Sequence, residues 1–367
     1  MAITISLCMI VKNEEEVLAR CLDGASRFAD EVVIVDTGST DATKEVAAKY
    51  TDRIYDFEWQ DDFSLARNYA FSLATQDYIM WLDADDIVDE ENIAKILELK
   101  ETLSPDVDAV MFLYNIAFDK QGKPTFHYYR ERLAKRSQNF QWKEPVHEHL
   151  AVGGNIKTLD IAIIHGHKNR IHSDRNLHIY ESILAKGEEL STRGCYYYAR
   201  ELMTHKRHRA AVSRYQMFLD RKDGWVEDKI NACGDMFDCY AALNESDKAQ
   251  EALYKSFTYD LPRPEICCRL GSLYMKSNRL EKAIFWYETA LQLKPGVNWG
   301  FVREDYRGYI PHMQLCVCYD RIGNREKALL HHEAAKALRP NDPAVLFNEN
   351  YFNPPSESSK KDSSSKE

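Results

Sequence analysis

Short apolar runs alternate with amphipathic segments in the first half of the chain. The runs at 3–10, 31–35 and 78–82 have the length and the β-branched content of buried strands. Between them, 17–25 and 64–73 carry apolar residues at the spacing of a helix that faces a core. Strands that alternate with helices predict a parallel sheet with right-handed crossovers.

Shorter elements complete this half. We expect a helix at 42–50, a strand at 53–55, a hairpin of strands 110–116 and 126–129 around a turn at 119–122, and a last strand at 161–164. Polar residues predict helix starts: Asn13 with Glu16 resembles a capping box, and Ser64 suits an N-cap. The first half therefore predicts an α/β domain.

Three carboxylates follow the strand expected at 78–82. In an extended chain Asp83 and Asp85 project to the same side, with Asp86 beside them. Paired carboxylate oxygens suit Mg²⁺ or Mn²⁺, ions that commonly bind diphosphates. The carboxyl ends of parallel strands are also where ligands bind in open α/β sheets. The cluster predicts an enzyme that acts on a nucleotide diphosphate.

The second half is helical and repetitive. Four similar patterns are anchored by Ala211, Ala249, Ala283 and Ala328, which are separated by 38, 34 and 45 residues. The middle interval matches the tetratricopeptide period of about 34 residues, and an insertion around 297–308 fits the longest interval. Such helix pairs stack into a curved solenoid with a concave surface. A generic helical bundle is the structural alternative.

The change in character near residue 175 divides the chain. We expect an α/β domain at 1–175, an all-α tetratricopeptide-like solenoid at 176–352 and a disordered tail at 353–367, rich in Ser and Lys. A length of 367 residues agrees with two domains.

Composition excludes several classes of protein. A net charge of −10 argues against general nucleic-acid binding, because phosphates repel an acidic surface. No apolar segment reaches the length that spans a bilayer, so we expect no membrane attachment. The nine cysteines lack zinc-type or C-x-x-C spacing and are expected in the core. Together these features predict a cytoplasmic protein.

Motifs of the first half resemble a known family. Residues 5–14 (ISLCMIVKNE), 32–41 (VVIVDTGSTD), 65–68 (LARN) and 81–86 (WLDADD) resemble the opening of family-2 glycosyltransferases, which have the GT-A fold. Residues 142–148 (WKEPVHE) resemble a segment of the subgroup that carries tetratricopeptide repeats. That subgroup includes enzymes that glycosylate bacteriocin peptides on Cys or Ser. The resemblance implies transfer of a hexose from a UDP-sugar, with inversion at the sugar carbon in a single displacement.

The resemblance also implies a metal site. Asp85 is the leading ligand, Asp83 binds the metal or the ribose, and Asp86 supports them. His165 ends an apolar strand and resembles the late His that GT-A enzymes often direct at the metal. The cation, Mg²⁺ or Mn²⁺, would offset the charge on the departing diphosphate. An acidic loop or a helix cap is the structural alternative.

The nucleotide is expected across the ends of the first strands. Glu14 and Asp36 can accept hydrogen bonds from a ribose hydroxyl or a base N–H. Arg67 offers a fork that suits uracil or phosphate oxygens, and Asp83 and His147 are further candidates for nucleotide-sugar contact. The structural alternatives are a helix N-terminal charge for Glu14, a turn residue for Asp36, a surface arginine for Arg67 and an ordinary structural histidine for His147.

Transfer needs a base near the acceptor, and Glu148 is the candidate. Its carboxylate could take the proton of a hydroxyl or thiol as that group attacks the anomeric carbon, and a thiol would need less help. A salt bridge to Lys143 or Arg132 is the structural alternative. Because water must be kept out, a mobile loop over the donor is expected, with 135–141 as the candidate.

The leading hypothesis is a metal-dependent sugar transferase whose repeats hold a peptide or protein acceptor. A transferase that acts on a glycan is the second hypothesis, and a repeat scaffold with an inactive transferase domain is the third. A nucleotidyltransferase would need a Gly-rich loop after the first strand, whereas residues 11–15 lack glycine. Repeat arrays often pair through a terminal helix, so a homodimer is a further expectation.

Overall fold

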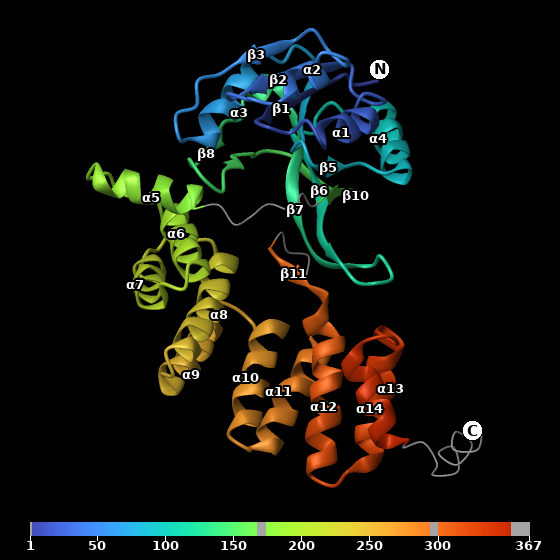
Figure 1. The fold of residues 1–367 in the computed structure, drawn as a ribbon, viewed down its shortest axis with the longest axis vertical. Coiled ribbons are helices and arrows are strands. Elements are labelled where there is room, and N and C mark those ends of the chain that lie inside the picture. Colours follow the sequence, from blue (N-terminus) through green and yellow to red (C-terminus); the bar gives the residue numbers. More distant parts are fainter. Residues whose placement is uncertain (1, 167–173, 294–299, 354–367) are drawn as a thin grey trace, which may run out of the picture. The chain divides into compact units, whose positions relative to one another are not determined.

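The structure is a computed structural model that describes residues 2–166, 174–293 and 300–353 (Figure 1). Across these residues, no helix combines the length and the apolar character that crossing a membrane requires. The tail that the sequence predicts to be disordered lies, apart from Asn353, outside the described residues.

The chain divides into two compact units. The first unit comprises residues 1–224 together with 298–302, and the second comprises 225–297 and 303–367. The boundary expected near residue 175 therefore falls inside the first unit, where the strands of the sheet give way to helices. Several helices of the repetitive half thus share a compact unit with the sheet.

A mixed sheet forms the centre of the first unit. β1 pairs in parallel with β2 and β4, and β2 with β3, which confirms the predicted parallel arrangement. β7 runs antiparallel to β4 and β6, so the predicted hairpin is also confirmed, with longer strands. The main path of the sheet runs in the order β3 (Ile54–Asp56), β2 (Glu31–Asp36), β1 (Ile5–Val11), β4 (Tyr78–Trp81), β7 (Pro124–Lys135), β6 (Ala109–Phe118), β10 (Ile156–His165) and β5 (Asp86–Ile87).

Helices pack on both faces of this sheet. Side chains of β1 alternate between two cores: Leu7 and Met9 pack in the core that includes residues of α1 and α4, whereas Cys8 packs with residues of α3. Because both faces are covered, the strands read as continuous apolar runs. The helices are α1 (Leu18–Ala25), α2 (Thr43–Ala47), α3 (Phe63–Ser72) and α4 (Glu90–Thr102).

Two predicted helix starts are wrong. The N-cap of α3 is Asp62, whose carboxylate accepts hydrogen bonds from the backbone N–H of Leu65 and from the hydroxyl of Ser64. Asn13 does not cap α1; its side-chain oxygen accepts from the backbone N–H of Thr40 at 2.8 Å and so joins the ends of β1 and β2. Periodicity located both helices, but the caps depend on tertiary contacts.

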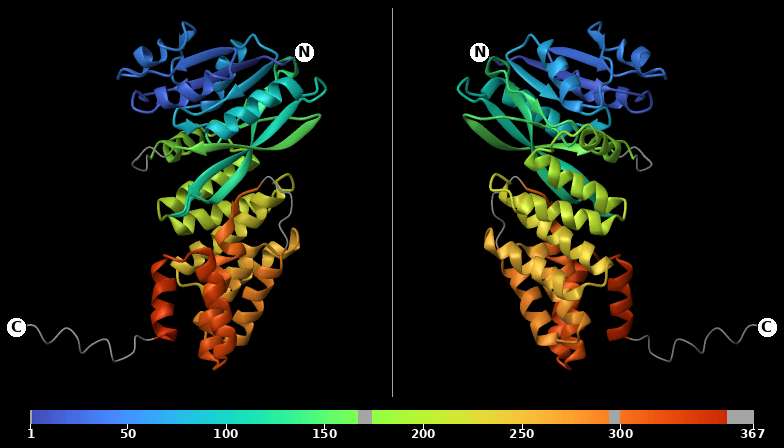
Figure 2. Two further views of the ribbon diagram at one scale, coloured as in Figure 1. Left: turned by 90° about the vertical axis from the view of Figure 1, so that its right-hand side faces the viewer. Right: turned by 90° about the vertical axis from the view of Figure 1, so that its left-hand side faces the viewer.

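The repetitive half consists of antiparallel helix pairs, and Figure 2 shows helices of the second unit side by side in both views. Each anchoring alanine is buried in the second helix of a pair, which confirms the predicted tetratricopeptide-like architecture. The helices are α5 (Arg175–Ala185), α6 (Thr192–Thr204), α7 (His208–Leu219), α8 (Val226–Ala242), α9 (Ser246–Lys255), α10 (Pro264–Lys276), α11 (Leu280–Gln292), α12 (Tyr309–Arg321), α13 (Arg325–Leu338) and α14 (Pro343–Phe352).

The longest interval between repeats contains a segment that returns to the first unit. α11 ends at Gln292 and α12 begins at Tyr309, so the extra residues fall where the sequence predicts an insertion, although 294–299 lie outside the described residues. Within the first unit the ring of Phe301 packs against Tyr128 of β7, with centroids 4.9 Å apart.

Candidate active site

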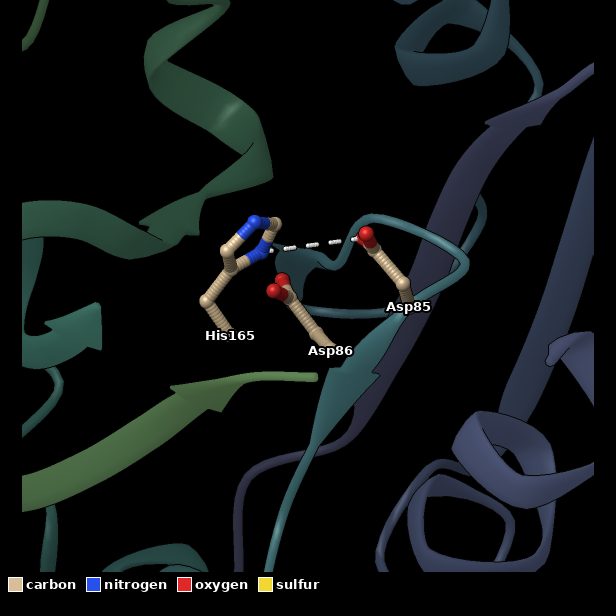
Figure 3. Close-up of side chains that lie close together, drawn as sticks. All are labelled: Asp85, Asp86 and His165. Carbon is tan, nitrogen blue, oxygen red and sulfur yellow. Dashed lines mark ion pairs between the residues drawn. The ribbon is translucent and has the colours of Figure 1, made fainter. Parts of the chain in front are cut away.

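Strand pairing brings Asp85, Asp86 and His165 together at one end of the sheet. β5 begins at Asp86 and pairs with β10, which ends at His165, so these two residues are direct partners. Oδ1 of Asp85 lies 3.8 Å from Nδ1 of His165. Figure 3 shows the three side chains directed toward one another, and one ligand atom of each lies within 4.8 Å of the others. Two of the predicted metal ligands, Asp85 and His165, therefore meet.

Asp86 organises this cluster. It is fully buried and accepts hydrogen bonds from Nη1 of Arg132 at 2.9 Å, from the hydroxyl of Tyr114 at 2.7 Å and from the backbone N–H of Asp83 at 3.0 Å. Burial raises the pKa of Asp86, and the charge of Arg132 opposes that rise. Three hydrogen bonds already occupy this carboxylate, so Asp85 and His165 are the better ligands for a cation.

Tyr114 orients the imidazole of His165. Burial, followed by the negative charge of Asp86, raises the pKa of Tyr114 far above its usual value, so the hydroxyl stays protonated and donates a hydrogen bond to Asp86. Its oxygen lies 2.9 Å from Nδ1 of His165 and accepts from a protonated Nδ1. The hydroxyl of Tyr114 thereby fixes the plane of the imidazole beside Asp85.

Asp83 lies outside this cluster. β4 ends at Trp81, and a turn follows in which the N–H of Asp86 donates to the carbonyl of Asp83 at 3.0 Å. The alternation of an extended strand therefore does not apply to Asp83 and Asp85, and the group of Asp85, Asp86 and His165 does not include Asp83. The Asp83 carboxylate instead accepts a hydrogen bond from Arg67.

Arg67 of α3 joins two predicted site residues. Its Nη2 lies 2.7 Å from Asp83 and its Nε lies 2.7 Å from Glu148, and the guanidinium lies over the rings of Trp81 and Trp142, 4.7 and 4.8 Å from their centroids. Burial raises the pKa of Asp83, but the charges of Arg67 and nearby arginines outweigh it and lower that pKa to about 2. The Glu148 side chain thus has an ionic partner, which is Arg67 rather than Lys143 or Arg132.

Asp36 and Glu14 lie buried beside the ends of β1 and β2. Oδ1 of Asp36 accepts from the backbone N–H groups of Gly38 and Ser39, at 2.9 and 2.8 Å. Oδ2 of Asp36 is buried without a hydrogen-bond partner among the described residues. The turn role is therefore real, and a second oxygen is left for a ligand donor. The backbone N–H of Glu14 donates to Oγ1 of Thr43 at 2.7 Å.

His147 is not brought to this cluster. Its Nε2 lies 2.8 Å from Oε1 of Glu201 on α6, and its ring stacks on Tyr197 of the same helix, with centroids 4.3 Å apart. The neighbouring His149 is half-buried, and burial followed by the charge of Arg193 lowers its pKa to about 4. His149 is therefore neutral near pH 7.

No role was expected for Tyr114 or for the two tryptophans beside Arg67, and Arg132 was considered only as a salt-bridge partner of Glu148, whereas it pairs with Asp86. Arg132 is fully buried, with its guanidinium over the rings of Trp81, at 3.9 Å, and Tyr114, at 4.4 Å. One signal was present: an arginine adjoins the apolar Leu133 and Ala134 of a central strand, where a charge needs a buried partner.

Comparisons with known proteins agree with this geometry. Residues 6–153 match the model of glycosyl transferase family 2, and residues 264–296 match that of the tetratricopeptide repeat. A TPR repeat-containing protein of Synechococcus elongatus is 35% identical over 146 residues, which are 39% of this chain and 34% of that protein. The prophage-derived glycosyltransferase SunS of Bacillus subtilis is 33% identical over 102 residues, 27% of this chain and 24% of SunS.

An uncharacterized glycosyltransferase of Rickettsia conorii is 32% identical over 87 residues, 24% of this chain and 30% of that protein. The matched segments thus span about a third or less of these relatives' own length. The family match covers Asp36, Asp85 and Glu148 and ends before His165. The chain therefore contains a family-2 glycosyltransferase domain followed by tetratricopeptide-type repeats.

Proposed function

We propose that this protein is a metal-dependent inverting glycosyltransferase that moves a hexose from a UDP-sugar to a Cys, Ser or Thr side chain of a peptide. The observation that carries the proposal is the pair of Asp85 and His165, held at the end of the sheet by the buried network around Asp86, in a domain of family 2. Stacked helix pairs support a peptide acceptor, because such arrays present extended binding surfaces.

Asp85 and His165 would hold Mg²⁺ or Mn²⁺ together with the donor diphosphate. A carboxylate oxygen and an imidazole nitrogen are donors that Mn²⁺ accepts, and two protein ligands leave room for phosphate oxygens. Bound there, the cation would offset the charge that develops on the leaving diphosphate. The protein's own contribution is to fix the two ligands through Tyr114 and the strand pairing of β5 with β10.

The nucleoside would be held by Asp36 and Glu14, whose buried carboxylates suit a ribose hydroxyl or a base N–H. The side chain of Asp83 is 37% exposed, and the charge of Arg67 keeps its carboxylate ionised. Asp83 can therefore accept a hydrogen bond from a hydroxyl group of the UDP-sugar. Arg67 itself is committed to two carboxylates and serves the site by holding them.

Glu148 would act as the base. The acceptor sulfur or oxygen attacks the anomeric carbon, the bond from that carbon to the diphosphate oxygen breaks, and the acceptor proton passes to Glu148. Inversion follows from this single displacement. The ion pair with Arg67 fixes the direction of the Glu148 carboxylate before the acceptor arrives.

Asp85→Asn tests the metal assignment. The variant should lose at least about 100-fold in metal-dependent transfer, because a neutral amide binds a hard divalent cation weakly. The measurement is mass spectrometry of cysteine- and serine-containing peptides incubated with UDP-hexoses and Mn²⁺ or Mg²⁺. The mass increment identifies the sugar, and fragmentation identifies the modified atom.

Asp89→Asn is the matched control. Asp89 is exposed and caps α4, and Asn serves equally well as an N-cap, so transfer should stay at the wild-type rate. Wild-type transfer by Asp85→Asn would remove the metal assignment. A wild-type chain that modifies glycans but no peptide would keep the transferase and overturn the acceptor.

A further inference from the structure

The proposed base lies in a tight hairpin loop. The two short strands β8 (Trp142–Lys143) and β9 (His149–Leu150) pair antiparallel, and residues 144–148 connect them. Glu144 and His147 have positive φ angles of 76° and 53° within this loop. Non-glycine residues adopt such angles at a cost, and they keep them only where the surroundings hold them in place.

Helix α6 holds one side of this loop. Glu201 accepts a hydrogen bond from Nε2 of His147 at 2.8 Å, and Asn176 of α5 donates to the same Glu201 oxygen at 3.2 Å. The His147 ring stacks on Tyr197 with an interplanar angle of 20°. The His147 carbonyl accepts from Nε of Arg193 at 3.2 Å. His147 is therefore fixed through both its side chain and its backbone.

Glu148 is held by residues of α3 and β7. The Glu148 carboxylate bonds Nε of Arg67 at 2.7 Å, and the Glu148 carbonyl accepts from Arg130 of β7 at 3.4 Å. Leu150, which follows in β9, donates its backbone N–H to Glu131 at 3.0 Å. The peptide between His147 and Glu148 thus joins the helical part of the first unit to the catalytic side of the sheet.

We propose that α6 positions the catalytic base: the contacts of Glu201 and Tyr197 with His147 hold the 144–148 loop in the conformation that directs Glu148 at the acceptor. This inference rests on the proposed function, in which Glu148 takes the acceptor proton. His147, Glu201 and Tyr197 are positioning residues, because they act on the reaction through Glu148. Without them the loop would relax toward negative φ angles and turn the carboxylate away from its target.

The first test compares Glu201→Ala with Glu201→Gln in the full chain. The probes are UDP-hexose with Mn²⁺ and a pool of synthetic peptides, each with one central cysteine or serine. Glu201→Ala should lower kcat by about 10- to 100-fold, because misplacing a reacting group by about 1 Å costs that much, while the KM for the donor stays within about twofold. Glu201→Gln should restore most of kcat, because its amide oxygen still accepts from Nε2 of His147.

Glu181→Ala on α5 is the matched control. Its carboxylate pairs with Arg207 and makes no contact with the 144–148 loop among the interactions described, so kcat should remain at the wild-type value. Should Glu201→Ala fail to fold, His147→Asn replaces it. Asn tolerates a positive φ but cannot stack on Tyr197, so the same loss in kcat is expected.

A double variant separates positioning from a general structural role. If Glu201 acts through Glu148, Glu201→Ala should cause no further loss in a Glu148→Gln background. Losses that multiply would overturn the inference, as would a wild-type kcat in Glu201→Ala alongside a slow Glu148→Gln. A wild-type rate in Glu148→Gln itself would instead overturn the base assignment of the proposed function, and this inference with it.

Discussion

Arg67 and Arg132 place two buried positive charges in the site, and each is enclosed by aromatic rings. Such charges are costly to bury, so each is matched by a carboxylate within hydrogen-bond distance. Arg132 pairs with Asp86, beside the proposed metal ligands, whereas Arg67 pairs with Glu148, the proposed base. The two arginines divide the proposed chemistry between them.

Removing Arg132 should leave the buried carboxylate of Asp86 without its ionic partner. We expect Arg132→Met to lower the free energy of unfolding by about 3–5 kcal/mol, because the side chains of both partners are 0% exposed and the remaining charge has no comparable partner. Urea unfolding monitored by tryptophan fluorescence measures the change. Arg27→Met, which removes an exposed pair with Glu90, should leave the unfolding midpoint where it is. Equal shifts in the two variants would contradict the expectation.

His149 should make stability depend on pH on the acid side of neutrality. Its pKa is about 4 in the folded chain against 6.5 for an ordinary histidine, so between these values the unfolded chain binds a proton that the folded chain does not. Stability should therefore fall as pH falls from about 6.5 to about 4. Buried His331, with a pKa of about 4, acts in the same direction.

Comparison with His149→Gln isolates the contribution of His149. The wild-type chain should lose more free energy of unfolding than the variant between pH 7 and about 4, as measured by urea titrations at each pH. Curves that decline in parallel would show that His149 contributes nothing to the slope.

The sequence predicted which residues lie at the candidate site, but it did not predict all of the side chains that they contact. The proximity of Asp85 and His165 was predictable because the first follows a strand and the second ends one, and the ends of strands that run in the same direction lie at the same edge of a sheet. The pairing of Arg67 with Glu148 joins positions 81 residues apart, and no local pattern encodes it. The direction of His147 was missed for the same reason, because it depends on packing against α6.

Helices and strands were the most predictable part of the chain, because hydrophobic periodicity follows from the core that each element faces. The repeat alanines also located the second helix of each pair. Ends of elements were less predictable: α1 has no side-chain cap, and α3 is capped two residues before Ser64. These ends depend on what the rest of the fold offers to unsatisfied backbone groups.

Close contact between α10 and α11 depends on Gly271. A Cβ at this position would lie 2.7 Å from the ring of Tyr287, which is buried and has little room to move. We expect Gly271→Ala to lower the free energy of unfolding by about 1–3 kcal/mol through overpacking, as measured by thermal or urea unfolding.

Gly234→Ala in α8 is the control for this substitution. There the nearest atom to an added Cβ is 3.5 Å away, in ordinary contact, so the higher helix propensity of Ala should leave stability unchanged or raise it. Destabilisation of both variants to the same degree would show that the loss at Gly271 reflects backbone effects rather than contact with Tyr287.

Taken as a whole, the chain does not separate its chemistry from its repeats at one point. The pattern of apolar residues changes from α/β to all-α near residue 175. The first compact unit nevertheless continues to residue 224 and also includes residues 298–302. Composition reports which local structure a segment forms, whereas compactness depends on which segments pack together. The α/β domain was therefore predictable in type, while its association with α5, α6 and α7 was not.

The return of Phe301 to the sheet has a practical consequence for engineering. A chimera that exchanges the repeats in order to redirect the enzyme cannot be assembled from a single splice, since the polypeptide leaves the first unit after residue 224 and revisits it at 298–302. The repeats taken from another protein would need an inserted segment between two helices that packs against Tyr128 as Phe301 does. Exchange of repeats between relatives is thus constrained by the path of the chain as well as by the residues on the surface of the repeats.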